Sequence, residues 1–277
     1  MFKLKQIGFF AAMTSTALAS LGANAQQPEP WQMSFQPSAT GIMEQTTWFH
    51  NAMLMPIITA TVIIVMALML WVIIRYNAKA NPNPSKVAHN TFIEVVWTAV
   101  PVLILIVIAI PSFGILYHQE QIPAEVDITI KATGAQFNWT YEYQDFEGFE
   151  VISNMKTDQQ LEPGEPRLLA VDYNAKVPAG KTVRVITTAS DVIHAFAVPA
   201  FGVKKDAVPG RLNETWFTAP EDTGIYYGQC SELCGPGHAF MPIAIEVVAP
   251  AEFKAWAEQQ MADQGLAPAA QQLAAAN

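Results

Sequence analysis

AMLMPIITATVIIVMALMLWVII, from Ala52 to Ile74, is the first of two stretches that decide the fold class, and VVWTAVPVLILIVIAIPSFGILY, from Val95 to Tyr117, is the second. Each has 23 residues and no charged side chain. As a helix rising about 1.5 Å per residue, each stretch is about 35 Å long, enough to cross a hydrocarbon core of about 30 Å. The sequence therefore predicts two transmembrane helices in an antiparallel hairpin over residues 52–117.

The segment before the hairpin has the features of an export signal. Two lysines precede a short apolar run, and small residues ending at Ala25 follow it. This pattern is typical of a secretory signal peptide, and an uncleaved anchor is the alternative. We therefore predict a signal peptide at 1–25 and an exported N-terminal segment at 26–51.

Basic side chains between the two helices predict the orientation of the hairpin. Arg75, Lys79 and Lys86 lie there, and this segment has no acid before Glu94. Short loops rich in Lys and Arg stay in the cytoplasm. The loop 75–94 is therefore predicted to be cytoplasmic, so both ends of the mature chain face outward.

The part of the chain after the second helix is acidic. From residue 120 to residue 277 it has 21 acidic and 10 basic side chains, a net charge of about −11 with histidine neutral. This charge attracts cationic partners and repels nucleic acid. A nucleic-acid-binding function is therefore excluded.

Short β-rich runs separated by Gly, Pro and Asn or Asp clusters follow the hairpin. The runs are 126–131, 136–143, 182–188, 215–218 and 242–248. They predict an antiparallel sandwich or barrel in an exported domain at 118–249, so the fold class is a membrane-anchored all-β protein. Helix formers then predict a helix at 250–262, and an Ala- and Gln-rich composition predicts a disordered tail at 263–277.

The only two cysteines of the chain lie in one loop that is rich in soft metal donors. The sequence from Gly228 to Pro242 reads GQCSELCGPGHAFMP, which contains both cysteines, a histidine and a methionine. Thiolate, imidazole and thioether select copper and other soft metals, whereas magnesium and calcium prefer oxygen. The Gly-Pro-Gly run lets the backbone turn sharply between the second thiol and the imidazole.

A distant histidine offers the second imidazole. His194 ends the run Ser-Asp-Val-Ile-His in another strand-to-loop region. Two bridging thiolates, two imidazoles, one thioether and one backbone carbonyl would serve two copper ions, an arrangement that changes little on reduction and favours electron transfer. Three alternatives remain open: a disulfide, a zinc site that leaves the methionine idle, and a blue-copper site that needs only one cysteine.

These motifs resemble subunit II of bacterial haem–copper cytochrome c oxidases. The resemblance rests on residues 191–196 and 198–211 and on the Cys-Ser-Glu-Leu-Cys loop, and it extends from Trp31 to Glu258. It implies a cupredoxin-like β-sandwich that holds a dinuclear copper A centre. The implied ligands are five side chains and one backbone carbonyl, that of the glutamate: His194, Cys230, Glu232, Cys234, His238 and Met241.

The resemblance also implies two further sites. The carboxylate of Glu232 would help hold a magnesium or manganese ion at the boundary with subunit I, and a solvated loop acid is the alternative. His89 and Glu94, at the cytoplasmic mouth of the second helix, match the entrance of a proton channel of subunit I. A carboxylate at a membrane edge can also be merely interfacial.

The electron donor that the resemblance implies is cytochrome c, a basic protein. The acids that match its docking surface are Glu142, Glu150, Asp172 and Asp191. Where the family usually has Trp-Tyr-Trp after Gly-x-Gln, this chain has Phe137-Asn138-Trp139. Phe137 thus stands at the position of the usual electron-entry tryptophan, and the sequence leaves open whether Phe137, Trp139 or another aromatic residue mediates electron entry.

Together these features predict the electron-accepting subunit of a respiratory terminal oxidase in the bacterial inner membrane, with its copper domain in the periplasm. It would take single electrons from cytochrome c and pass them to the haem of subunit I, where oxygen reduction is coupled to proton pumping, with subunit III as a further partner. The chain has no Cys-x-x-Cys-His motif, so the donor is external. The alternatives are a quinol oxidase subunit without copper and an exported copper carrier.

Overall fold

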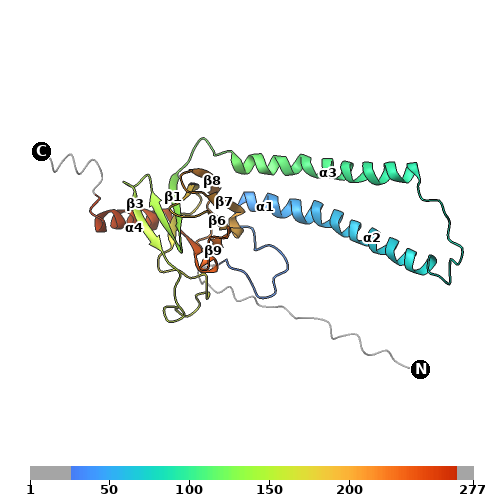
Figure 1. Cartoon of the computed structure of the whole chain (residues 1–277). Coiled ribbons are helices and arrows are strands. Elements are labelled where there is room, and N and C mark those ends of the chain that lie inside the picture. The colour runs from blue at the N-terminus through green and yellow to red at the C-terminus, as the bar shows by residue number, and fades with distance from the viewer. Residues whose placement is uncertain (1–25, 267–277) are drawn as a thin grey trace, which may run out of the picture.

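The computed structural model describes residues 26–266. The predicted signal peptide at 1–25 lies outside the described residues, as does most of the predicted tail at 263–277. A helical hairpin and a β-sandwich make up the described part, and the hairpin projects from one side of the sandwich (Figure 1).

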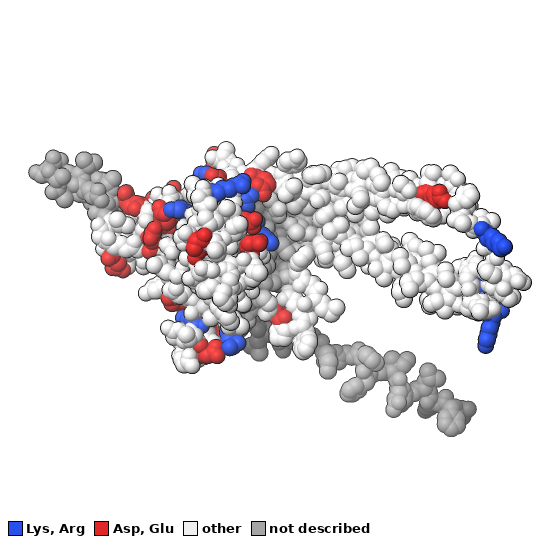
Figure 2. Space-filling view, in the orientation of Figure 1, with Lys and Arg blue, Asp and Glu red and all other residues white. Residues whose placement is uncertain are grey.

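The hairpin consists of two long apolar helices. The first is a continuous helix in which α1 (Gly41–Trp48), the π-helical turn η1 (Phe49–Leu54) and α2 (Met55–Arg75) follow one another. The second is α3 (Thr91–Glu120), which begins at the N-cap Asn90. Both helices are long and apolar enough to cross a membrane. Charged side chains cover the sandwich and leave most of the hairpin bare, with basic ones at its far end (Figure 2).

The sandwich contains two five-stranded sheets, with the strand orders β3-β2-β1-β5-β8 and β4-β10-β9-β6-β7. The strands are β1 (Ile128–Ala135), β2 (Asn138–Tyr143), β3 (Phe149–Ser153), β4 (Ala175–Pro178), β5 (Thr182–Ala189), β6 (His194–Val198), β7 (Val203–Ala207), β8 (Asn213–Thr218), β9 (Gly224–Cys230) and β10 (Pro242–Val248). The predicted fold class, a membrane-anchored all-β protein with a cupredoxin-like sandwich, is confirmed.

The sheets are mixed, whereas the sequence predicted purely antiparallel ones. β1 pairs in parallel with β5, and β4 pairs in parallel with β10. Parallel neighbours need a long connection, and the chain between β1 and β5 supplies it by way of β2, β3 and β4. Periodicity along one strand cannot show the direction of its partner, so this feature was not predictable locally.

Aromatic side chains fill the space between the sheets. In β1 and β5 every second residue is buried, as expected of strands with one face on a core. Trp139, Tyr141 and Tyr143 project from β2 into this core and are at most 1% exposed. Helix α4 (Pro250–Asp263) closes one end of the core with Phe253 and with Trp256, whose ring lies edge-on to Tyr143.

Several contacts attach the outer end of the hairpin to the sandwich. The hydroxyl of Thr40, the N-cap of α1, donates a hydrogen bond to the carbonyl of Phe201 at 2.7 Å. At the end of α3, Glu120 forms an ion pair with Lys205 of β7. The neighbouring His118 lies edge-on to Trp216 of β8, with 5.5 Å between ring centroids. These contacts hold the sandwich at the end of the hairpin where α1 begins and α3 ends.

Candidate metal centre

The cysteine loop joins two neighbouring strands of one sheet. Cys230 is the last residue of β9, and the chain returns through the short 3-10 helix η3 (His238–Phe240) to begin β10. β9 and β10 are antiparallel partners, with Gln229 opposite Pro242. The loop therefore leaves and re-enters the sheet at the same edge, which brings its first and last residues together.

Strand pairing also brings His194 to this edge. β6 begins at His194 and pairs with β9 through Phe196, which lies opposite Cys230. Beyond this pair the loop continues beside β6, and the amide of Ser231 donates to the carbonyl of Ala195 at 3.0 Å. The imidazole thus lies beside the thiol, although 36 positions separate the two residues.

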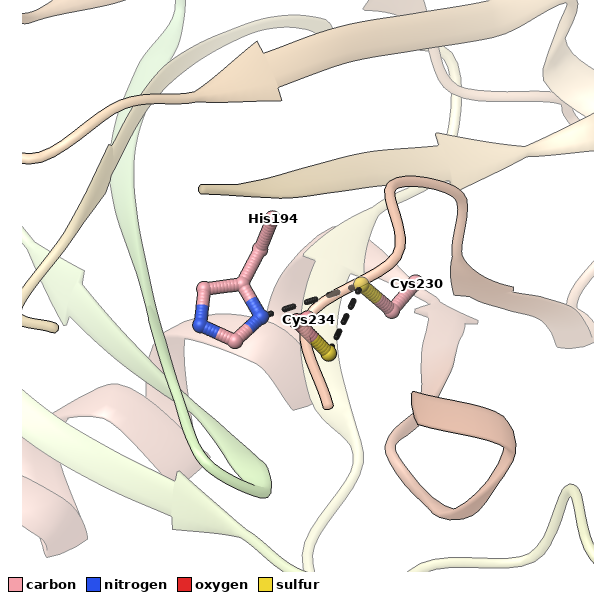
Figure 3. Close-up of side chains that lie close together, drawn as sticks. All are labelled: His194, Cys230 and Cys234. Atoms are coloured by element: carbon pink, nitrogen blue, oxygen red, sulfur yellow. Dashed lines mark hydrogen bonds between the residues drawn. The ribbon is translucent and has the colours of Figure 1, made fainter. Parts of the chain in front are cut away.

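All the predicted donor atoms gather in one cluster, whose centre Figure 3 shows. The donors of His194, Cys230 and Cys234 lie within 4.8 Å of one another. Cys230 Sγ is 3.8 Å from His194 Nδ1 and 3.9 Å from Cys234 Sγ. Cys234 Sγ in turn lies 3.5 Å from both His238 Nδ1 and Met241 Sδ.

A hydrogen bond to Asp191 fixes the orientation of the His194 ring. The side chain is fully buried, its Nδ1 faces the sulfur atoms, and its Nε2 lies 2.9 Å from Asp191 Oδ1. A carboxylate in this position selects the tautomer that leaves Nδ1 free for a metal. Burial raises the pKa of Asp191, but hydrogen bonds from His194 and two backbone amides outweigh it and keep that pKa below its ordinary value.

Both cysteines are free, buried thiols. Their sulfur atoms are 3.9 Å apart, whereas a disulfide bond is about 2.05 Å long, so the disulfide alternative does not describe this state. Burial, with a smaller contribution from Cys230, raises the pKa of the Cys234 thiol to about 11. At neutral pH this thiol therefore stays protonated unless a cation stabilises the thiolate, as a bound soft metal does.

The remaining donors fit a soft metal site too. Met241 is 1% exposed, with its sulfur facing the thiols, so the thioether is part of the cluster. The backbone carbonyl of Glu232 lies 3.4 Å from Cys230 Sγ, whereas the residue itself is exposed to solvent. The Glu232 carboxylate has no hydrogen-bond partner within the described part of the chain, so it is free to take one from outside.

The two aromatic candidates for electron acceptance occupy different places. Trp139 is fully buried, and its ring lies behind His194 at 6.1 Å between centroids. Phe137 is half-buried and packs over the metal loop, where a β-carbon on Gly237 would clash with its ring. Phe137 therefore lies between solvent and the cluster, whereas Trp139 lies on the interior side.

The four predicted docking acids have different partners within the chain. Glu142 and Glu150 are register partners on β2 and β3, so their side chains share one face of that sheet. Glu142 also pairs with Lys131 at 2.7 Å. Asp172 instead accepts hydrogen bonds from Asn154, and Asp191 is engaged with His194.

The predicted proton-channel residues lie at the opposite end of the molecule. His89 is exposed in the loop before α3, and Glu94 is in the first turn of that helix. The Glu94 carboxylate accepts a hydrogen bond from the amide of Asn90 at 3.1 Å, which caps the helix. The structure brings neither residue near the cysteine cluster, which lies beyond the other end of the hairpin.

Sequence reasoning missed two residues that build the site. Gln136 donates a hydrogen bond from its side chain to the carbonyl of Cys234 at 2.6 Å. Gly134 lies so close to His194 that a β-carbon there would be 2.9 Å from the ring. The Gly-Ala-Gln run before Phe137 is the sequence signal that points to these two residues.

Family models match both parts of the chain. The model described as "Cytochrome C oxidase subunit II, transmembrane domain" matches residues 28–115, and the model described as "Cytochrome C oxidase subunit II, periplasmic domain" matches residues 128–248. The first covers the hairpin up to residue 115, and the second covers all ten strands.

Individual relatives agree with these matches. A "Probable cytochrome c oxidase subunit 2" of Rickettsia felis is 51% identical over 245 residues, which cover 88% of this chain and 77% of the relative. "Cytochrome c oxidase subunit 2" of Arabidopsis thaliana is 42% identical over 245 residues, with 85% and 92% covered. The solved periplasmic domain of subunit II of the Bradyrhizobium japonicum cytochrome oxidase is 55% identical, covers 53% of this chain and 100% of its own, and has a TM-score of 0.48. At this identity and coverage, the chain belongs to the cytochrome c oxidase subunit II family.

Proposed function

We propose that this chain is the electron-accepting subunit of its oxidase and binds two copper ions. It accepts single electrons from cytochrome c and passes them to the haem of subunit I, where oxygen reduction is coupled to proton pumping. The observation that carries the proposal is the convergence of all six predicted donor groups, His194, Cys230, the Glu232 carbonyl, Cys234, His238 and Met241.

The donor set suits electron transfer rather than hydrolysis. A pair of copper ions held by both thiolates would share the charge, so that little would change around either ion on reduction. The residues of this chain keep the donors in place: Cys230, Cys234 and Met241 are almost fully buried, and Asp191 orients His194. A buried, oriented donor set has little freedom to rearrange when the charge changes, which favours fast transfer.

Electrons enter, in this proposal, through Phe137. Its half-buried ring separates solvent from the metal loop, and the fully buried Trp139 packs against His194 as a core residue.

An acidic surface steers the basic cytochrome c toward this domain, and the residues that contribute to it are Glu142, Glu150, Asp172 and Asp191. Exposed charges are screened by salt, so the association rate should fall as ionic strength rises; a rate indifferent to salt would argue against this docking surface.

Two further sites complete the proposal. The exposed carboxylate of Glu232 would bind the magnesium or manganese ion that this chain shares with subunit I. Glu94 and His89 would form the entrance of a proton channel at the far end of the hairpin. Both sites face outward from this chain, as expected of groups that a second subunit completes.

The arrangement in the membrane follows from the charges. A signal peptide at 1–25, a cytoplasmic loop at 75–94 and a periplasmic copper domain at 118–249 describe a multi-pass protein of the bacterial inner membrane. Subunits I and III would pack against the hairpin, whose apolar side chains are otherwise exposed. Sequencing the N-terminus of the mature protein tests the first boundary, since a chain that still begins at Met1 contradicts it.

Electron paramagnetic resonance of the full chain, purified in detergent and loaded with copper, tests the metal centre. We expect about two copper ions per chain and a hyperfine pattern from one electron shared by two equivalent copper nuclei. A pattern from a single copper nucleus, or zinc as the bound metal after expression, would refute the proposal. Expressing the chain without subunit I keeps haem signals out of the spectrum.

A further inference from the structure

The two halves of the donor cluster come from separate parts of the chain. His194 begins β6, whereas Cys234 and the donors that follow it lie in the loop after β9. Pairing between β6 and β9 extends only from Phe196 and Ala197 to the start of this loop. Most of the loop lies beyond the ladder, so another contact must hold Cys234 opposite His194.

The turn between β1 and β2 makes that contact. The side-chain amide of Gln136 donates to the carbonyl of Cys234 at 2.6 Å, and its backbone amide donates to Asp191 Oδ2 at 2.7 Å. The other oxygen of Asp191 lies 2.9 Å from His194 Nε2. An unbroken series of hydrogen bonds therefore runs from one metal-binding half to the other by way of Asp191 and Gln136.

Close packing surrounds this bridge on both sides. A β-carbon on Gly235 would lie 2.9 Å from Gln136 Nε2, and one on Gly237 would clash with the ring of Phe137. On the other side, Gly134 touches the His194 ring, and its carbonyl accepts a hydrogen bond from the amide of Ser190. The turn thus fits between the histidine and the cysteine loop with no spare room.

We propose that Gln136 is a positioning residue that holds the cysteine loop against the His194 half of the site, before and after metal binding. The proposal rests on the function proposed above, because it concerns how that donor set stays assembled. Within the described residues the Cys234 carbonyl has no other hydrogen-bond partner, so losing the Gln136 amide leaves it without a partner in the chain. A loop that lacks such a tether opens more often, and opening exposes both thiols.

The test compares Gln136→Met with wild type in the full chain, purified in detergent. Methionine keeps the length of the side chain and removes the donor. In the copper-free protein, the rate at which an uncharged aromatic disulfide modifies the two thiols reports how often the loop opens. We expect this rate to rise about tenfold, in line with the loss of one hydrogen bond to a buried carbonyl. Copper-loaded protein should lose its metal to a chelator faster by a similar factor.

Gln259→Met is the matched control. Gln259 lies on α4, is exposed, and also donates a side-chain hydrogen bond, to Asp263 at 2.7 Å. This variant should react and lose copper at the wild-type rates. Unchanged rates in Gln136→Met would overturn the proposal, as would increases of equal size in both variants.

A second variant separates a local effect from a folding defect. Gln136→Asn keeps the amide but is one methylene shorter, so it cannot reach the Cys234 carbonyl. Its thiols should also react faster than those of wild type. Its thermal unfolding midpoint should equal that of wild type. Faster reaction accompanied by a lowered midpoint in both variants would overturn a purely positioning role. Because the thiol assay uses no metal, it remains valid if wild type fails to bind two copper ions, and that failure would count only against the proposed function.

Discussion

Aromatic side chains are mostly buried in the sandwich and mostly exposed on the hairpin. Trp139 in the sandwich is 0% exposed, whereas Trp97 in α3 is 61% exposed. The sandwich encloses its aromatic residues between two sheets and a helix, so this part of the chain provides its own apolar environment. The hairpin has two helices that meet mainly at their outer end, so lipid and other subunits must provide that environment.

The polar sites follow the same division. Four donor side chains of the cluster, those of His194, Cys230, Cys234 and Met241, are buried within this chain, and Asp191 hydrogen-bonds His194. Glu94, at the other end, makes only a cap bond to its own helix, and the exposed His89 has no described partner. The proposed metal site has all its donors in this chain, whereas the proposed proton entrance would be completed by a second chain. Substitutions at the two sites should therefore affect different steps of turnover.

The largest effect is expected from Cys230→Ser, which removes a thiolate that is proposed to bind both copper ions. A hydroxyl is a poor donor for a soft metal, so the variant should not assemble a dinuclear copper site. Oxidase turnover with cytochrome c should fall by more than about 100-fold, beyond what the loss of an outer hydrogen-bond partner to a ligand typically costs. Copper content and turnover of the purified complex measure this. Ser231→Ala, in the same loop, should retain both, and a Cys230→Ser complex with normal copper content would contradict the ligand assignment.

A matched pair of tryptophan substitutions tests the division between the two regions directly. In the copper-free chain, Trp139→Ala should lower the free energy of unfolding of the sandwich by about 3–5 kcal/mol, because it leaves a large cavity in the core. Trp97→Ala should lower it by less than about 0.5 kcal/mol, because the ring packs on no part of the sandwich. Urea unfolding followed by near-ultraviolet circular dichroism measures both values. Similar values for the two variants would mean that the regions are not independent.

Glu94→Ala tests the proposed entrance of a proton channel, which a second subunit would complete. Removal of a positioned proton carrier should slow turnover of the complex by roughly tenfold or more. Reduction of the copper site by cytochrome c should keep its rate, because the cluster lies at the other end of the molecule. Stopped-flow absorbance resolves the two steps. A variant that turns over at the wild-type rate would remove Glu94 from the proton path.

The smallest effect is expected from acid acting on surface carboxylates of the sandwich. A hydrogen bond from the Thr182 amide and a second from Lys181 hold the pKa of Asp127 below its ordinary value. A carboxylate with a lowered pKa in the folded state stabilises that state above its ordinary pKa of about 3.9, and this stabilisation is lost as pH falls through the folded value. Asp127→Asn should therefore lower the urea midpoint slightly at pH values near 7 and match wild type in strong acid. A difference that persists unchanged in strong acid would contradict this linkage.

Local patterns predicted much of the fold. Uncharged apolar stretches located both membrane helices, because length and absence of charge are sufficient for a hydrocarbon core. Alternating or β-rich runs located β1, β2, β5, β8 and β10 within a few residues. The pattern missed β3, β4, β6, β7 and β9, and in β6 four of the five residues are buried. A strand without alternation gives no period to detect.

For the site, the sequence by itself determined the donor types: two thiols, one imidazole and a thioether in a Gly-rich loop favour a soft metal. Only the tertiary structure decided the geometry. The pairing of β6 with β9 placed His194 beside Cys230. The fold also placed Phe137 on the solvent side of the site and Trp139 on the core side. Gln136 came to lie between the His194 half of the site and the cysteine loop. Donor type is a property of single residues, whereas these contacts join positions far apart in the chain and exist only once the sheets have paired.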